Sequence, residues 1–218
     1  MTLTLAVDTT ADRGSIALAD ETGVREEVML DAPRGFSHVI FGEIEALLQR
    51  QGAGLEDIRL FAGASGPGSF TGVRIGLAAI KGLAETLGRP ALAISNLEAF
   101  GALGTADLRA PLIDAHRGEV FAALFNARDA AVMAESVLKL SAFVEALGER
   151  RVQWISPDET ILASVPAGSP VMLAPVAMAG TMAMLAIRHF MAGAVSDPAA
   201  IEANYVRRSD AELLWKEA

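Results

Sequence analysis

The first thirty positions alternate between hydrophobic and polar or small residues in a pattern that predicts three consecutive strands. Apolar residues occupy every second position of residues 3–7, and strand-like runs over 16–18 and 24–30 follow glycine-containing turns. Asp8 ends the first run, so this strand would deliver a carboxylate to the edge of a sheet. The chain is therefore expected to open as a three-stranded meander.

Helical periodicity then alternates with strands. Ser37 can cap a helix that reaches residue 51, and a strand over 58–65 leads to a helix over 72–87. The strand over 91–94 is continuously apolar, which predicts a central place in the sheet. A short helix over 96–104 completes the order βββαβαβα, which is that of a ribonuclease-H-like half in an α/β protein.

A second, reduced half begins near residue 105. A strand that ends at Asp114 and a return strand over 120–125 repeat the opening hairpin with its carboxylate. The order of elements assigns a Met-rich helix over 176–191 to this half. The predicted organisation is a first domain, a reduced second domain and a tail that packs back on the first domain: residues 1–104, 105–200 and 201–218.

Composition and charge narrow the range of functions. The chain has 218 residues, 52% of them hydrophobic, which is enough for a sizeable core. It carries 18 Lys and Arg against 27 Asp and Glu, a net charge of −9, so direct binding of nucleic acid is disfavoured and any role on nucleic acid would need a basic partner. The absence of cysteine excludes disulfides, Cys-bound zinc and thiol nucleophiles. With no basic leader and no long apolar run, we expect a cytoplasmic protein without membrane association.

A glycine-rich turn over residues 66–72 joins a strand to a helix. Its glycines can adopt positive φ, Ser69 or Thr71 can cap the helix, and the bared amides suit an anion. The turn matches neither a P-loop nor a dinucleotide fingerprint, since the required Lys and third glycine are missing. The alternative is a tight turn whose glycines serve helix–strand packing. The candidate nucleotide contacts are Asp8, Thr9, Gly66, Gly68, Ser69 and Asp114.

Catalytic and metal-binding patterns are weak. Asp8 and Asp114 stand where a two-domain actin-like enzyme places carboxylates that hold Mg²⁺ through water, but both can equally satisfy turn amides. His38, His116 and His189 lack the His-x-x-x-His spacing of a helical metal site, so no metal is expected. Only His116, in the second hairpin, stands where it could face a ligand.

Two predicted helices offer faces on which a partner could pack. The helix from residue 72 has a side of small residues that another helix could approach closely, although the chain's own sheet is an equal alternative. The helix before it carries an apolar stripe. The residues expected at a partner interface are Ile40, Phe41, Ile44, Leu48, Gly72, Arg74, Gly76, Ala79 and Leu83.

Residues 66–76, GPGSFTGVRIG, closely resemble the signature of the TsaB (YeaZ) family, degenerate actin-like paralogues of TsaD. Residues 6–10 and 113–121 resemble further segments of that family. The closing residues 205–207 do so as well, although Ala203 replaces a usual proline. Phe36 stands where the family often has histidine, which leaves the contact of that histidine without a counterpart.

The resemblance implies a non-catalytic subunit. Such a protein pairs with TsaD through the two helices above, joins the ATPase TsaE, and supports transfer of a threonylcarbamoyl group to the adenosine beside the anticodon of tRNA. Alone it forms a homodimer through the same faces. It requires no cofactor, although ATP or ADP with Mg²⁺ can lie near the heterodimer interface. The alternative is a small actin-like ATPase or nucleotide-binding module that acts on its own.

Overall fold

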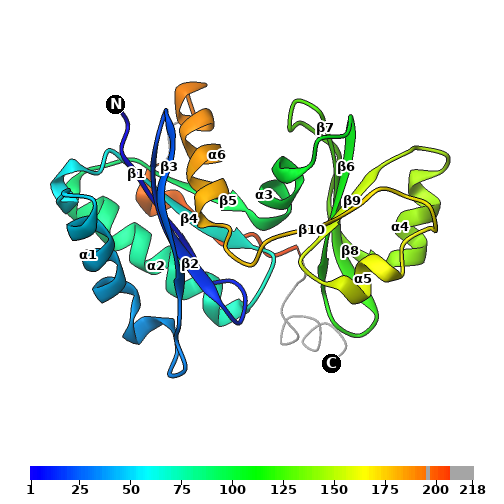
Figure 1. The fold of residues 1–218 in the computed structure, drawn as a ribbon, viewed down its shortest axis with the longest axis horizontal. Coiled ribbons are helices and arrows are strands. Elements are labelled where there is room, and N and C mark those ends of the chain that lie inside the picture. Colours follow the sequence, from blue (N-terminus) through cyan, green and yellow to red (C-terminus); the bar gives the residue numbers. More distant parts are fainter. Residues whose placement is uncertain (195–196, 207–218) are drawn as a thin grey trace, which may run out of the picture. The chain divides into compact units, whose positions relative to one another are not determined.

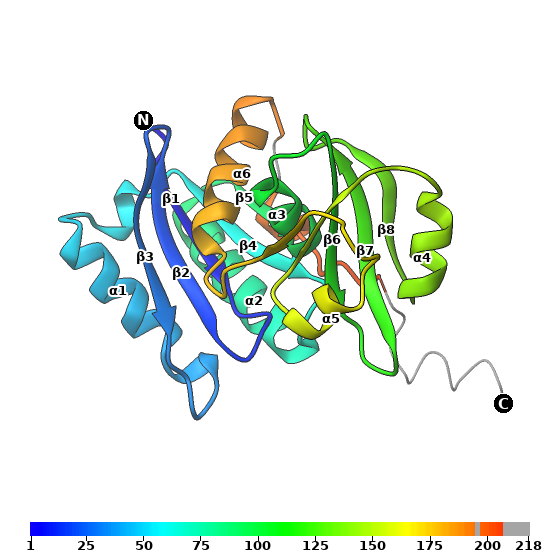
Figure 2. The ribbon, with the colours of Figure 1, turned by 45° about the vertical axis from the view of Figure 1, so that its right-hand side comes forward.

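The computed structural model describes residues 1–194 and 197–206 and shows an α/β protein. These residues cluster into two compact units, one formed by residues 1–99 with 175–203 and the other by residues 100–174 with 204–206. Each unit is built on one five-stranded sheet (Figures 1 and 2). The predicted class, α/β with two ribonuclease-H-like, actin-like halves, is confirmed.

The first sheet has the strand order β3-β2-β1-β4-β5. Strand β1 pairs antiparallel with β2 and parallel with β4, and β2 pairs antiparallel with β3, so the predicted meander is confirmed. The strand predicted to be central, β5, lies instead at an edge. It is apolar because helices α2 and α6 both contact it. The strands are β1 Thr4–Asp8, β2 Gly14–Asp20, β3 Gly23–Leu30, β4 Leu60–Gly66 and β5 Ala91–Ser95.

The two faces of this sheet differ in side-chain size. On one face the register aligns Leu5 with Leu18 and Phe61, all fully buried. Side chains of successive strand residues point to opposite faces, so the intervening positions form the other face. That face is lined by alanines in register across three strands: Ala17, Ala6 and Ala62. A helix can approach such a surface closely.

Helices α1 (Ile40–Arg50) and α2 (Phe70–Leu87) cover the face with large side chains and share one core with it. Ser69 caps α2 as predicted, because its Oγ accepts a hydrogen bond from the Gly72 amide at 3.2 Å. Ser37 does not cap α1. A 3-10 turn, η1 (Phe36–His38), precedes the helix, which begins at Ile40 without a side-chain cap.

Helix α6 (Ala179–Met191) packs on β1, β2 and β4 of the first sheet, on the side away from α1 and α2 (Figure 1). The prediction that this helix belongs to the second half is therefore wrong. Periodicity shows that a helix has a core-facing side but not which sheet that side meets. Ala179, Gly180 and Ala183 are buried and small, which suits the alanine-lined face.

The second unit has the strand order β10-β9-β6-β7-β8. The chain enters it through α3 (Asn96–Leu103), and Phe143 packs edge-on against Trp154 in its core, with ring centroids 6.0 Å apart. The five-residue helix α5, capped by Asp158, was not predicted. The remaining elements are β6 Leu108–Asp114, β7 Glu119–Asn126, β8 Ala131–Lys139, β9 Gln153–Ser156, β10 Val171–Leu173, α4 Leu140–Leu147 and α5 Glu159–Ala163.

Two more short 3-10 turns belong to the first unit. These are η2 (Leu55–Asp57), before β4, and η3 (Pro198–Ala200), after α6. Ile201 then joins the core of the first unit, whereas the tail predicted from the sequence lies outside the described residues from position 207. Within residues 1–194 and 197–206, no helix has the length and apolarity needed to cross a bilayer.

Candidate functional site

Asp8 ends β1 in a closed turn. Its side chain is 4% exposed, and its Oδ1 accepts hydrogen bonds from the Thr10 amide at 2.9 Å and the Thr10 hydroxyl at 2.6 Å. Of the two interpretations left open by the sequence, the structure supports a carboxylate that satisfies a turn amide.

The glycine-rich turn packs against the residues that follow Asp8. The Thr9 hydroxyl donates to the Gly72 carbonyl at 2.7 Å, and the Ser69 amide donates to the carbonyl of Thr10 at 2.7 Å. A Cβ atom at Gly68 would lie 2.6 Å from that Thr10 oxygen, and one at Gly72 would overlap the Thr9 carbonyl. The glycines therefore allow a close approach between two backbone segments, which is the packing interpretation of this turn.

Asn96 joins these groups into one network at the carboxyl ends of β1, β4 and β5. Its Nδ2 donates to the Thr10 hydroxyl at 2.6 Å, and its Oδ1 accepts from the Gly66 amide at 3.1 Å. Asn96 is 3% exposed. Sequence reasoning placed it only at a helix start. The available signal was a pair of polar residues, Ser95 and Asn96, at the end of the predicted apolar strand 91–94, similar to the signal that identified Asp8.

Burial raises the pKa of Asp8 above its ordinary value. The hydrogen bonds from Thr10 act in the opposite direction, and the negative charge of Glu27 adds to the rise. Asp8 is thus a carboxyl group whose protonated form is favoured by its surroundings.

The N-terminus of α6 meets side chains of β2 and β3. Ser15 Oγ accepts hydrogen bonds from the amides of Met178 at 3.1 Å and Ala179 at 3.0 Å, and Glu27 Oε1 accepts from the Gly180 amide at 2.9 Å. Helix N-termini attract anions because their first amides lack partners. Here the chain's own side chains already satisfy three of these amides.

Asp114 belongs to the second unit and forms a similar turn. Its Oδ1 accepts from the His116 amide at 2.8 Å, and its Oδ2 lies 3.1 Å from His116 Nδ1. The turn-amide interpretation therefore also holds here. His116 and Arg117 adopt positive φ, and both side chains are exposed.

The other two histidines lie in η1 and α6. His38 is exposed in η1, and His189 Nε2 lies 2.9 Å from Glu98 Oε1. Among residues 1–194 and 197–206, no three His, Asp or Glu side chains come close enough together to hold a metal ion.

Most of the residues expected at a partner interface are buried within the chain's own core, so they cannot form a free surface. The Cβ position of Gly76 lies 2.6 Å from Thr9 Oγ1, which shows that the small-residue side of α2 faces β1. Leu83 is half-buried against the same core. The buried residues are Ile40, Ile44, Leu48, Gly72, Gly76 and Ala79.

A different stripe of α2 faces outward. Arg74, Ala78 and Gly82 are exposed, and Phe70, at the start of the helix, is 46% exposed with the Arg74 guanidinium 3.7 Å from its ring centre. On α1, Phe41 is 55% exposed. We call these five residues the outer face. Of the predicted interface, Phe41 and Arg74 belong to it.

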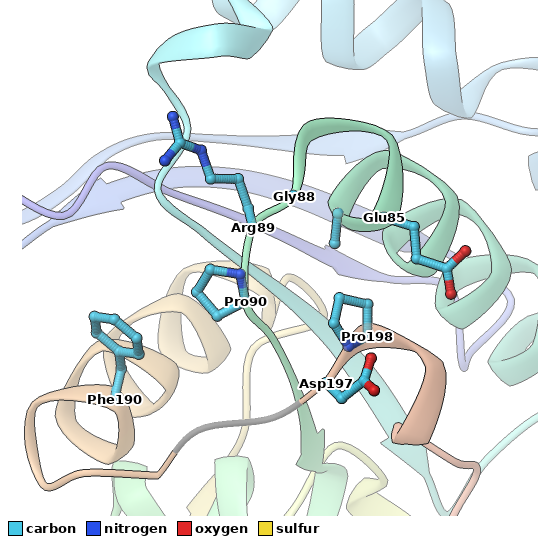
Figure 3. A pocket seen from close by; sticks show the side chains of 8 residues that line it. Glu85, Gly88, Arg89, Pro90, Phe190, Asp197 and Pro198 are labelled. Carbon is cyan, nitrogen blue, oxygen red and sulfur yellow. The ribbon is translucent and has the colours of Figure 1, made fainter.

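A shallow cavity of about 560 Å³ lies in the first unit where α2 and α6 end. Its lining includes Pro90, Phe190 and Asp197. Figure 3 shows the charged ends of Glu85 and Arg89 pointing in different directions rather than into the cavity. Ligand sites require convergent polar groups, so the cavity is not assigned a ligand.

The chain is similar to known proteins over most of its length. Residues 28–200 match the family model described as TsaD, tRNA N6-adenosine threonylcarbamoyltransferase. The chain is 32% identical over 151 residues to the tRNA threonylcarbamoyladenosine biosynthesis protein TsaB of Bacillus subtilis (strain 168), covering 67% of this chain and 66% of that protein. It is also 32% identical over 161 residues to the protein of the same description from Escherichia coli (strain K12), covering 70% and 69%.

A solved structure supports the fold. It is described as an uncharacterized protein with similarity to peptidase YEAZ from Pseudomonas aeruginosa. It superposes with a TM-score of 0.80 at 23% identity, covering 95% of this chain and 100% of that one.

Proposed function

Because the chain belongs to the TsaB (YeaZ) family, we propose that it is a non-catalytic subunit that binds a TsaD-type threonylcarbamoyltransferase and keeps that enzyme active. In this role it supports threonylcarbamoyl transfer to the adenosine beside the anticodon of tRNA. The family works in tRNA threonylcarbamoyladenosine biosynthesis, as the names of its relatives state. A TsaE-type ATPase would join the pair in the cytoplasm.

The observation that carries the proposal is the outer face. It combines two half-exposed aromatic rings, Phe41 and Phe70, with the small exposed positions Ala78 and Gly82. Aromatic rings supply much of the energy of protein interfaces, and small residues let a partner helix approach closely. A Cβ atom at Gly82 would meet nothing within 4 Å inside the chain. The same face would pair two copies of this chain when the partner is missing.

The alternative of an independent ATPase has less support from the residues. Asp8 Oδ1 already accepts two hydrogen bonds from Thr10, and the α6 amides are satisfied by Ser15 and Glu27. The described residues of the first unit therefore do not fit a magnesium–nucleotide site by themselves. No cofactor is required in the proposed role, and any weak binding of ATP or ADP would involve the partner.

The test is a charged substitution on the outer face. Ala78→Arg places a long cation where the partner helix would lie. We expect it to weaken binding to the purified TsaD-type enzyme at least about tenfold, or about 1.4 kcal/mol. Transfer to tRNA should fall at subunit concentrations below saturation. Binding is measured by calorimetry and transfer with labelled threonine.

The matched control is Ala142→Arg, because Ala142 is also an exposed helical alanine but lies on α4. It should leave both readouts unchanged. Gly76 is unsuitable for this test, since a side chain there would disturb Thr9. Normal binding and transfer by the Ala78 variant would eliminate the outer face as the docking surface.

A further inference from the structure

Residues 197–203, here called the C-terminal strap, lie along α2 and are anchored by Lys81. The Lys81 ammonium donates to the carbonyl of Ala199 at 3.0 Å and to that of Ile201 at 3.1 Å. These carbonyls stand at the end of η3. Carbonyls at the end of a helical turn lack partners within it, and a lysine ammonium is well suited to them.

The strap is preformed for this contact. Asp197 Oδ1 accepts from the Ala199 amide at 2.9 Å, and the Ala200 amide donates to the Asp197 carbonyl at 2.9 Å. Ile201 is only 5% exposed and belongs to the core of the first unit. The strap is therefore held by the buried side chain of Ile201, by Ala203, which packs against the same core, and by one cation.

The next residues of the chain are fixed in the second unit. The Asn204 side-chain amide donates to Glu135 Oε2 on β8 at 2.5 Å. The chain passes between the units after residues 99, 174 and 203. Only residues 202 and 203 separate Ile201 from Asn204, so this last crossing is anchored close to both of its ends.

We propose that Lys81 is a latch that holds the strap on α2 and thereby couples α2 to the edge strand β8 of the second sheet. With the ammonium in place, the strap and the Asn204–Glu135 contact stabilise each other through a linker of two residues. Without it, the strap detaches more often, and β8 loses support at the same time. Lys81 is a positioning residue in this device.

Hydrogen–deuterium exchange of the full chain tests the latch. In Lys81→Met, which keeps the aliphatic stem but loses the charge, the amides of Ala200 and Ile201 should exchange about tenfold faster or more, because charge-assisted hydrogen bonds are strong. The β8 amides should also exchange faster. Lys81→Arg should restore most of the protection. The control Arg13→Met removes an exposed cation from the turn between β1 and β2 and should leave both regions unchanged.

Two outcomes would overturn the proposal. Unchanged exchange of the strap in Lys81→Met would mean that the apolar contacts of Ile201 and Ala203 hold it without the cation. Faster exchange of the strap with unchanged β8 would mean that the two are not coupled. Asn204→Ala tests the same coupling from the side of β8, because it removes the contact with Glu135. If the two regions are coupled, this variant should exchange faster in the strap as well as in β8.

Discussion

At the scale of single residues, contacts with Thr9 and Thr10 are the reason why glycines stand at positions 68 and 72 and why the carboxylate of Asp8 is hydrogen-bonded. The Thr9 hydroxyl and the Thr10 carbonyl bind the glycine-rich turn, while the Thr10 hydroxyl donates to Asp8 and accepts from Asn96. Each member is buried and hydrogen-bonded, as is usual for polar groups in a protein interior. The cluster is therefore a rigid joint between β1, β4 and α2.

Asp8→Asn should make stability less dependent on pH. The raised pKa means that, between the ordinary value of 3.8 and the folded-state value, the unfolded chain loses its proton while the folded chain keeps it. Stability of the parent protein therefore falls as pH rises through that window and stays lower above it. Asn is neutral throughout and keeps an acceptor for Thr10. We expect the variant to be the more stable protein at pH 7 and to lose its advantage near pH 3.8, by urea unfolding.

Asp20→Asn serves as the control, because the pKa of Asp20 is shifted in the opposite direction to that of Asp8. Hydrogen bonds from Thr22, with Arg25 nearby, lower the pKa of Asp20 to about 2. This carboxylate therefore stabilises the fold above pH 3.8, and its contribution is lost as pH falls toward 2. Its replacement should be destabilising at pH 7. If both variants shift stability equally at all pH values, the assignment for Asp8 is wrong.

At this scale the turns could be predicted from the sequence, but the hydrogen-bond network of Asp8, Thr10 and Asn96 could not. Asp8, Asp114 and Ser69 were recognised because each follows a strand or precedes a helix, which are local signals. Asn96 was missed as a partner of Thr10, since 86 positions separate them. Only the parallel pairing of β1, β4 and β5 brings those strand ends together.

The helices and strands themselves were predicted more reliably than which of them pack against each other. The strand–helix order of the first half is confirmed because its periodicity is strong and its turns contain glycine. The side on which α2 packs was left open, and the structure turns the side with Gly72 and Gly76 toward β1. The placement of α6 was wrong because its partner sheet ends at Ser95, far before the helix begins at Ala179. No local pattern specifies that choice.

The cap of α6 is the element-scale contact that can be tested most directly. Ser15→Ala removes the acceptor for two amides of the helix N-terminus, so we expect a loss of about 1–2 kcal/mol in the free energy of unfolding. Urea denaturation monitored by circular dichroism measures it. Ser37→Ala is the control, because Ser37 is exposed and caps nothing, and it should change stability by less than about 0.5 kcal/mol. Equal losses in both variants would contradict the role given to Ser15.

Charge sets the behaviour of the whole molecule toward RNA. With a net charge of −9, the chain repels phosphate at long range. We expect no binding of tRNA by the isolated chain at about 0.15 M salt and protein concentrations up to about 100 μM, where basic proteins bind without specificity. Filter binding or a gel shift tests this. Saturable binding by the chain alone would mean that it contacts the substrate directly in the proposed complex.

The discontinuity of the first unit affects the order in which the protein can mature. Strands β1 to β5 are synthesised early, but the alanine-lined face of their sheet stays bare until α6 has been made. Residues 1–99 alone would expose this surface and lack Ile201 in their core. The amino-terminal unit thus begins first but closes only after residues 175–203 have been made, and the stretch between residues 100 and 174 can fold before it does.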